Sequence, residues 1–170
     1  VARNIDVTVA KLVEYRGQIR FSDGTIAIQD YVPMSASLGA TFRILGGRLV
    51  FDQMRLDTDG AVSDLTGAIH MTRWPEQLYN VKSRIQLPRM RELFFATNTF
   101  SLHGEADFTG TFHLFKGGRE LKGDFFSREA GLNQYRFPDL EGSLVWLPRQ
   151  FDVTRATSGS SSTAVYSSSG

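Results

Sequence analysis

The sequence of 170 residues contains no cysteine. This absence excludes thiol catalysis, cysteine-ligated zinc sites and disulfide bonds, and it leaves both reducing and oxidising compartments open. Long hydrophobic runs are also missing, since the apolar run at 93–96 is far shorter than the roughly 18 residues of a membrane-spanning helix. The N-terminus lacks the pattern of a secretion signal. Because alternation is already under way at Ile5, Val7 and Val9, we expect a soluble module or fragment of a longer protein.

An excess of charge of one sign is absent as well. Nineteen basic and 18 acidic residues give a formal net charge of +1, and the two signs are interspersed along the chain. Such a balance creates no field that would attract a nucleic-acid backbone, so we expect no nucleic-acid partner. The sequence also lacks a Gly-x-Ser-x-Gly elbow, a phosphate-binding glycine loop and a dinucleotide fingerprint. We therefore expect no enzyme activity, no catalytic residue and no cofactor.

What the sequence does contain is alternation. From 101 to 115 it reads SLHGEADFTGTFHLF, and apolar or glycine residues alternate with polar ones. Side chains of a β-strand project alternately to the two faces of a sheet, so this segment predicts one strand with an apolar side and a polar side. Its length of about 50 Å, at roughly 3.3 Å per residue, exceeds that of a usual strand, and Gly110 is the expected point of a split or bend. Such a strand is typical of a trough, a barrel wall or a solenoid.

Similar signals continue along most of the chain. Strands are expected at 40–44, 49–56, 65–71, 78–87, 121–126, 140–146 and 151–153. The segment Ser22–Gly24, with its Asp-Gly pair, predicts a tight hairpin between strands at 17–21 and 26–28. A slip in the alternation at Gln53 predicts a β-bulge.

One segment has helical periodicity. Apolar residues at 90, 93 and 94 follow Pro88 with helical spacing, so a short amphipathic helix is expected near 88–95. Arg89 and Arg91 are expected on its wet side, and contact with lipid headgroups is the alternative role for this pair.

The length suits a single domain, in which we distinguish two parts. Residues 1–156 form the strand-rich part, where glycine-led stretches at Gly17, Gly47, Gly110 and Gly142 indicate weak repeats of about 30 residues. Residues 157–170 are mostly serine and glycine, and we expect a frayed last strand or partial disorder there.

Two groups of side chains resemble metal ligands. His103, Glu105, Asp107 and His113 share a strand face by parity, but on a straight strand His113 lies about 20 to 33 Å from Asp107 and His103, so a solvated strand face is the simpler interpretation. The acidic run at 57–60 resembles part of a calcium loop but lacks the further acids of that motif, which favours a turn. We expect no metal site.

The aromatic content is high, with 13 phenylalanines that lie largely on the apolar parity of the strands. They either fill the closed core of a sandwich or line an open groove for acyl chains. Composition by itself does not distinguish the two arrangements.

Two segments, Gly46–Met71 and Phe125–Trp146, resemble parts of the AsmA-like and TamB-like proteins of Gram-negative bacteria. In those proteins a glycine opens an alternating strand, a polar step follows, and another glycine-led alternating strand returns. The segment at 88–95 is similar to the short helical inserts among the strands of those proteins. The resemblance implies a bent sheet that forms an open trough, the β-taco, with an apolar interior. It also implies a periplasmic location, an inner-membrane anchor outside this fragment, and a role in phospholipid transfer or outer-membrane assembly.

We therefore expect an all-β fold with a long, curved antiparallel sheet that forms an open trough. The expected partners are a phospholipid, flanking segments of the same chain and, as implied by the resemblance to TamB-like members, an outer-membrane barrel of the Omp85 kind. By parity and size, the expected groove residues are Phe42, Ile44, Leu49, Phe51, Leu65, Ile69, Phe108, Phe112, Leu144 and Trp146. A closed β-sandwich or jelly roll, acting as a structural or interaction module, is the alternative. A transmembrane barrel is a third interpretation, disfavoured by the mixed charges and the helix.

Overall fold

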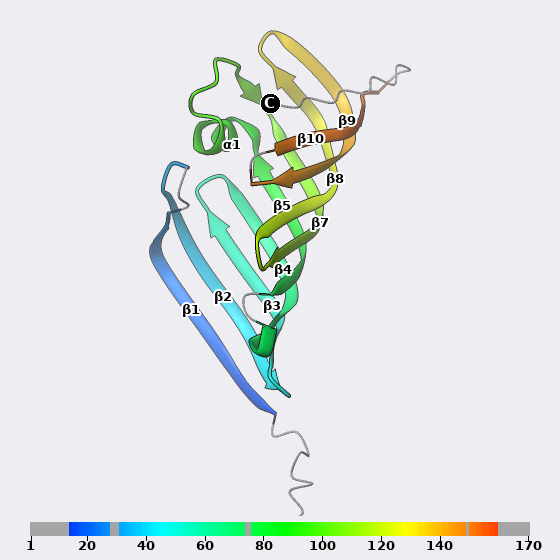
Figure 1. Ribbon diagram of the computed structural model, residues 1–170. Coiled ribbons are helices and arrows are strands. Elements are labelled where there is room, and N and C mark those ends of the chain that lie inside the picture. Colours follow the sequence, from blue (N-terminus) through cyan, green and yellow to red (C-terminus); the bar gives the residue numbers. More distant parts are fainter. Residues whose placement is uncertain (1–13, 28–30, 74–75, 149, 160–170) are drawn as a thin grey trace, which may run out of the picture.

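The computed structural model describes residues 14–27, 31–73, 76–148 and 150–159. They form strands almost throughout, as predicted (Figure 1). The elements in chain order are β1 (Tyr15–Ile26), β2 (Met34–Leu45), β3 (Arg48–Thr58), β4 (Ala61–His70), a 3₁₀-helix η2 (Met71–Arg73), β5 (Gln77–Gln86), α1 (Leu87–Phe94), β6 (Leu102–His103), β7 (Glu105–Phe115), β8 (Gly118–Leu132), β9 (Tyr135–Leu147) and β10 (Gln150–Thr157).

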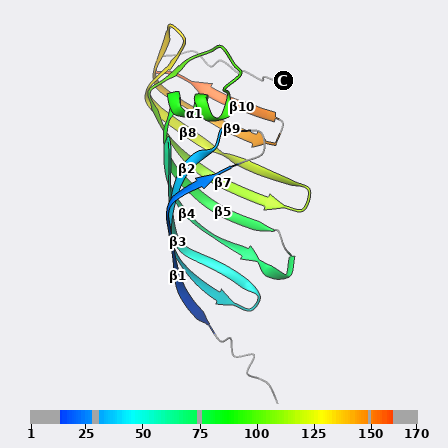
Figure 2. The ribbon, with the colours of Figure 1, turned by 90° about the vertical axis from the view of Figure 1, so that its left-hand side faces the viewer.

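All the strands belong to one antiparallel sheet. Its order is β1-β2-β3-β4-β5-β7-β8-β9-β10, and the short β6 pairs with β8. Within the described residues β1 does not pair with β10, so the sheet remains open. Its strands bend toward one side, and α1 lies on that side (Figure 2). The predicted open, curved sheet is confirmed, and the alternative of a closed sandwich is wrong because the described strands make a single layer.

The pairing register separates an apolar face from a polar face. Directly opposed residues of antiparallel strands share a face, and Phe42 opposes Phe51, which in turn opposes Gly67. Gly67 opposes Tyr79, and Tyr79 opposes Phe112. We call this side the apolar face. Its buried core consists of Ala40, Phe51, Tyr79, Val81 and Phe108.

Glycines on the apolar face lie beneath aromatic rings of neighbouring residues. A Cβ atom at Gly67 would lie 2.2 Å from the carbonyl oxygen of Leu78 and 2.7 Å from a ring carbon of Tyr79. The Phe108 ring covers Gly110 and Gly123 in the same way. A ring of this kind fills the space left by the missing side chain and allows the backbones to approach closely, an arrangement that permits strong curvature. The Phe42 ring covers Gly17 and the Phe125 ring covers Gly142 in a similar way.

Bulges in the strands test two local predictions. The bulge at Gln53 is confirmed, since the register between β3 and β4 shifts between Phe51 and Met54. The hairpin at Ser22–Gly24 is wrong: β1 continues through it with a bulge against β2, in which Asp23 has a φ of 56°. An aspartate with positive φ serves a bulge as well as a turn, so the local signal was ambiguous.

The split of the long strand occurs at a different glycine from the predicted one. β7 runs without interruption through Gly110, whereas Gly104, with a φ of 94°, separates β6 from β7. The Gly104 carbonyl accepts a hydrogen bond from the Leu87 amide at 3.0 Å, which ties this break to the start of α1.

The predicted helix is present as α1, with Pro88 in its first turn. No helix among the described residues is long and apolar enough to span a membrane. The glycine-led stretches lie at β1, β3, β7 and β9, and the antiparallel pairings direct β1 and β3 oppositely to β7 and β9. Thr157 ends β10, and Gly159 donates a backbone hydrogen bond to Pro138. The rest of the predicted serine-rich end, 160–170, lies outside the described residues, as does the alternating segment at 5–9.

Candidate functional site

A row of aromatic rings crosses the apolar face. The rings of Phe42, Phe51, Tyr79 and Phe112 come from β2, β3, β5 and β7, and successive centroids lie 6.2–6.4 Å apart. The Tyr79 hydroxyl donates a hydrogen bond of 2.8 Å to the Gln77 side chain, and burial raises the pKa of this phenol. The row is therefore an apolar strip, and its one hydroxyl group, that of Tyr79, is hydrogen-bonded.

The ten predicted groove residues all lie on the apolar face by register, but their exposure differs. Phe51 and Phe108 are buried, at 6% and 4% exposure, and belong to the core of the sheet itself. Ile44 opposes Leu49 near the β2–β3 turn, and both are half-buried. The other half-buried positions that pack against the core are Phe42, Leu65, Ile69, Phe112 and Leu144. Their partial exposure leaves apolar surface available on this face.

Sequence reasoning missed several residues of the same face. Tyr79 and Val81 belong to the core, and Met54, Leu121 and Phe125 pack against it. Each lies on the apolar parity of a strand that the alternation identified, except that Met54 follows the bulge, where the parity changes. Extending the parity to every position of those strands would have found the residues other than Met54.

Trp146 belongs to a second aromatic cluster around α1. The Phe94 ring lies 5.0 Å from the Trp146 ring and 4.9 Å from the Tyr31 ring, centroid to centroid. Phe95 lies 5.8 Å from Phe151 of β10, and Phe95 also packs near Phe100. Tyr31 precedes β2, whereas Trp146 and Phe151 belong to β9 and β10. This α1 cluster therefore connects the segment before β2 with β9 and β10, which lie near the opposite edge of the sheet. It also covers one end of the apolar face.

The two arginines of α1 are engaged within the protein. Arg89 forms ion pairs with Asp59 in the β3–β4 turn and with Glu92 at 2.5 Å. Arg91 donates hydrogen bonds to the backbone carbonyls of Phe100, at 2.8 Å, and Asn98. The hydrogen bond from Arg89 holds the pKa of Asp59 below its usual range. These contacts give both side chains a role in anchoring α1.

The polar face carries ion pairs between neighbouring strands. Arg43 and Asp52 are joined by two hydrogen bonds of 2.7 and 2.8 Å, and Arg84 lies 3.4 Å from Asp107. No three histidine or acidic side chains gather at one point in the described part of the chain. The acidic run at 57–60 ends β3 and forms the turn before β4, as predicted.

Comparison of the chain with protein-family models, curated proteins and solved structures gives no match. The resemblance to AsmA-like and TamB-like proteins therefore stays a prediction, and the geometry of the two faces is the basis for the proposed function.

Proposed function

We propose that the apolar face shields the acyl chains of a phospholipid. The protein would act without catalysis, as a segment of a longer periplasmic protein anchored in the inner membrane, whose flanking strands extend the trough. In this role it serves phospholipid transport between the two membranes or outer-membrane assembly, with an Omp85-type barrel as the partner at the outer membrane.

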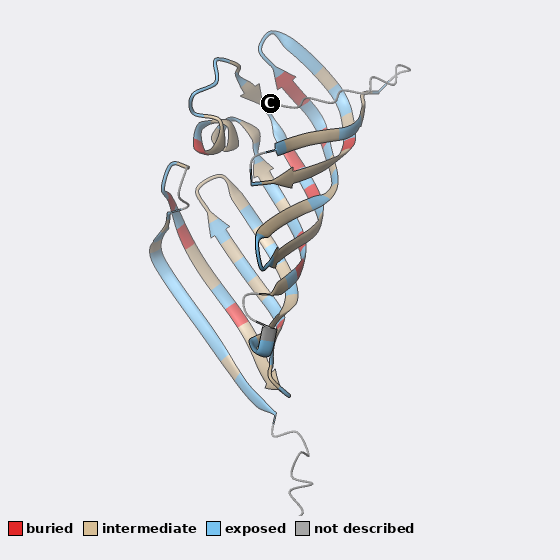
Figure 3. Cartoon of the chain, viewed as in Figure 1, coloured by how far each residue is buried: buried red, intermediate tan, exposed pale blue. Residues whose placement is uncertain are grey.

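The observation that carries the proposal is an apolar sheet face that the described part of the chain leaves without a second layer over most of its area. Among the described elements, α1 packs on this face at one end only, through the α1 cluster. Half-buried side chains such as Leu49, Ile69 and Phe112 continue the apolar surface beyond it, and residues of intermediate burial recur along the strands of the sheet (Figure 3). On the edge strand β1, Ile19 and Phe21 are 39% and 48% exposed.

Acyl chains can cover such a surface and remove it from contact with water. Each buried methylene contributes about 0.8 kcal/mol, and a headgroup remains in water at the open rim of the trough. No covalent step is needed, because the driving force is removal of apolar surface from water.

Native mass spectrometry of the chain purified from a Gram-negative host tests the proposal, with organic extraction to identify what is bound. We expect a stoichiometric phospholipid on the wild type. Phe112→Asp places a charge on the apolar face, and we expect it to abolish this occupancy while circular dichroism still reports a folded sheet. Ile44→Asp, nearer the β2–β3 turn, provides a second site where a charge disturbs less of the core.

Thr111→Asp is the matched control, because it adds the same charge one residue away on the polar face, opposite Lys122. Its lipid occupancy should equal that of the wild type. A folded wild-type chain without bound lipid would contradict the proposal, and equal occupancy in Phe112→Asp and Thr111→Asp would remove Phe112 from the lipid path.

A further inference from the structure

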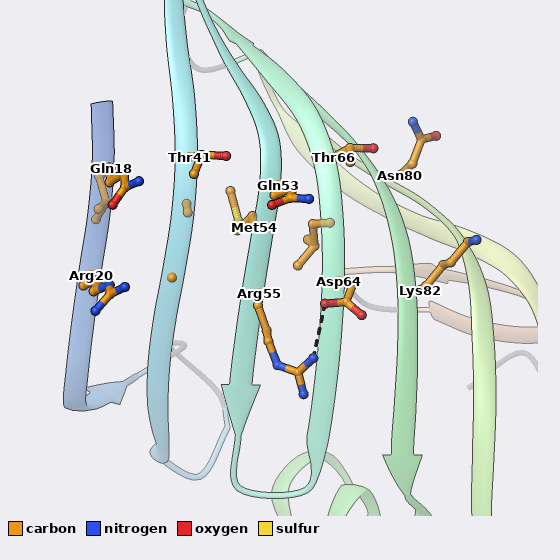
Figure 4. Close-up of a pocket in the computed structure, with 14 residues that line it drawn as sticks. Gln18, Arg20, Thr41, Gln53, Met54, Arg55, Asp64, Thr66, Asn80 and Lys82 are labelled. Carbon is orange, nitrogen blue, oxygen red and sulfur yellow. Dashed lines mark ion pairs between the residues drawn. The ribbon is translucent and has the colours of Figure 1, made fainter. Parts of the chain in front are cut away.

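The polar face carries a shallow hollow of about 680 Å³ that extends from β1 to β5 (Figure 4). Two adjacent cross-strand rows of residues line it. The neutral row consists of Gln18, Thr41, Gln53, Thr66 and Asn80, and the charged row consists of Arg20, Gly39, Arg55, Asp64 and Lys82. The remaining lining residues are apolar, and each lies in the sequence between one residue of the neutral row and one residue of the charged row. The hollow lies on the side of the sheet opposite the proposed lipid groove.

Gly39 leaves an open space within the charged row. It stands directly between Arg20 and Arg55 in the register, and a Cβ atom placed on it meets no atom within 4 Å. Unlike Gly67, Gly39 is therefore not needed for a close approach between neighbouring backbones. A glycine inside a strand weakens the strand, and it often marks a place where a ligand comes close to the backbone.

The β-bulge in β3 shapes the same hollow. Asp52 reaches Arg43 on the polar face, and the next residue, Gln53, also lies on that face, where it lines the hollow. Bulges re-aim side chains in this way. Two irregularities, Gly39 and the bulge, thus lie side by side at one place on an otherwise regular face.

The side chains around the hollow suit an acidic ligand. Neither Arg20 nor Lys82 forms an ion pair with another described residue. Arg55 lies 3.5 Å from Asp57 and 3.7 Å from Asp64, and three cationic side chains face one carboxylate within the lining. A guanidinium group binds carboxylate and phosphate oxygens in a two-pronged geometry.

The neutral row suits hydroxyl groups. Side-chain amides and hydroxyls both donate and accept hydrogen bonds, as sugar hydroxyls do. Adjacent strands lie about 4.8 Å apart, so the five positions extend over about 19 Å, with one hydrogen-bonding group at each strand. An extended, hydroxyl-rich chain lying across the strands would meet these groups in succession.

We propose that this hollow binds an oligosaccharide that carries carboxylate or phosphate groups. Its hydroxyls lie along the neutral row, and its acidic groups lie along the charged row beside Arg20, Arg55 and Lys82. The backbone at Gly39 forms the floor beneath the ligand.

Isothermal titration calorimetry with tetragalacturonate tests this inference. Gly39→Ile places in the hollow an apolar side chain that a strand accepts, and we expect the affinity to fall by about tenfold or more. Ser37→Ile makes the same kind of change on the same face of β2 outside the lining, and its affinity should match the wild type. Lys82→Gln should also weaken binding, and added salt should reduce the difference between Lys82→Gln and the wild type.

Uncharged cellotetraose and inorganic phosphate complete the test. Cellotetraose should bind more weakly than tetragalacturonate, and equimolar phosphate should not displace the saccharide. Absence of tetragalacturonate binding to the wild type would overturn the inference, as would equal affinities of the wild type and Gly39→Ile. Equal binding of cellotetraose would overturn the acidic specificity, and displacement by phosphate would reduce the hollow to a site for an adventitious ion only.

Discussion

Glycine positions on the two faces have opposite surroundings. Gly67, on the apolar face, lies against the backbone of Leu78 and beneath the ring of Tyr79. Gly39, on the polar face, borders open space. The same residue type therefore permits close packing in one place and leaves a hollow in the other, and each role gives a different response to an added methyl group.

Gly67→Ala should destabilise the fold. The new Cβ would meet a carbonyl oxygen at 2.2 Å, and since that atom belongs to the neighbouring strand, the backbones must separate. Overpacking of this kind costs about 1–3 kcal/mol in the free energy of unfolding, which urea denaturation measures.

Gly39→Ala is the matched control for this prediction. The methyl group meets no atom, and the substitution reduces the freedom of the unfolded chain, so a gain of about 0.4–1 kcal/mol is expected. Equal losses of stability in the two variants would contradict the role of the close contact at Gly67.

Among the elements, α1 depends most on contacts made by other parts of the chain. Its eight residues are too few to form a stable isolated helix. Leu93 is 2% exposed, its carbonyl accepts a hydrogen bond from the Val32 amide, and the Arg89–Asp59 ion pair joins the helix to the β3–β4 turn. Packing and these anchors therefore hold the helix at one end of the apolar face.

The Asp59 anchor predicts a dependence of stability on pH. In the folded protein the pKa of Asp59 lies below its ordinary value of 3.8, chiefly because Arg89 donates a hydrogen bond to it. The ion pair therefore contributes fully above pH 3.8, and its contribution is lost as the pH falls through the lowered pKa. Asp59→Asn should lower the melting temperature at pH 7 and match the wild type more closely near pH 3.

Asp23→Asn provides the control for Asp59→Asn. Asp23 is exposed and forms no ion pair with another described residue, and asparagine also tolerates its positive φ. Its melting temperature should follow that of the wild type at both pH values. A deficit in Asp59→Asn that stays constant from pH 7 to pH 3 would contradict the proposed role of the carboxylate charge.

At the scale of the whole molecule, the fold is a single curved layer with one helix at its end. The described sheet has two free edges, β1 and β10, and its buried residues are few and spread along the strands (Figure 3). The large hydrophobic side chains that are exposed include those of Tyr15 and Phe21 in β1. Local opening should therefore begin at this edge, where backbone pairing exists on one side only.

Hydrogen exchange measured by mass spectrometry tests this expectation. We expect the slowest exchange in the central strands β4, β5, β7 and β8, and the fastest exchange among the strands in β1. Exchange in β1 as slow as in β5 would contradict a free edge and would indicate that another chain covers it, since edge strands readily pair with other chains. Dilution of the sample would then restore fast exchange in β1.

Sequence alternation determined the element types and the division into two faces. A period of two fixes which side chains share a side, so Phe42, Phe112 and Leu144 could be assigned to one face. The slip at Gln53 located the bulge, and the spacing after Pro88 located α1. The break at Gly104 and the continuation of β1 through Asp23 could not be predicted, because they depend on pairing with β8 and β2.

The amino-acid sequence by itself determined that this protein is an antiparallel β-protein with one apolar and one polar face. Tertiary structure decided between the predicted open trough and its closed alternative, and it alone showed that α1 covers one end through Trp146 and Tyr31 and that Gly39 borders a hollow. The physical reason is the separation along the chain of the residues that interact. Alternation is a property of neighbouring residues, whereas curvature, covering and hollows arise from side chains that are distant in sequence and meet only in the folded sheet.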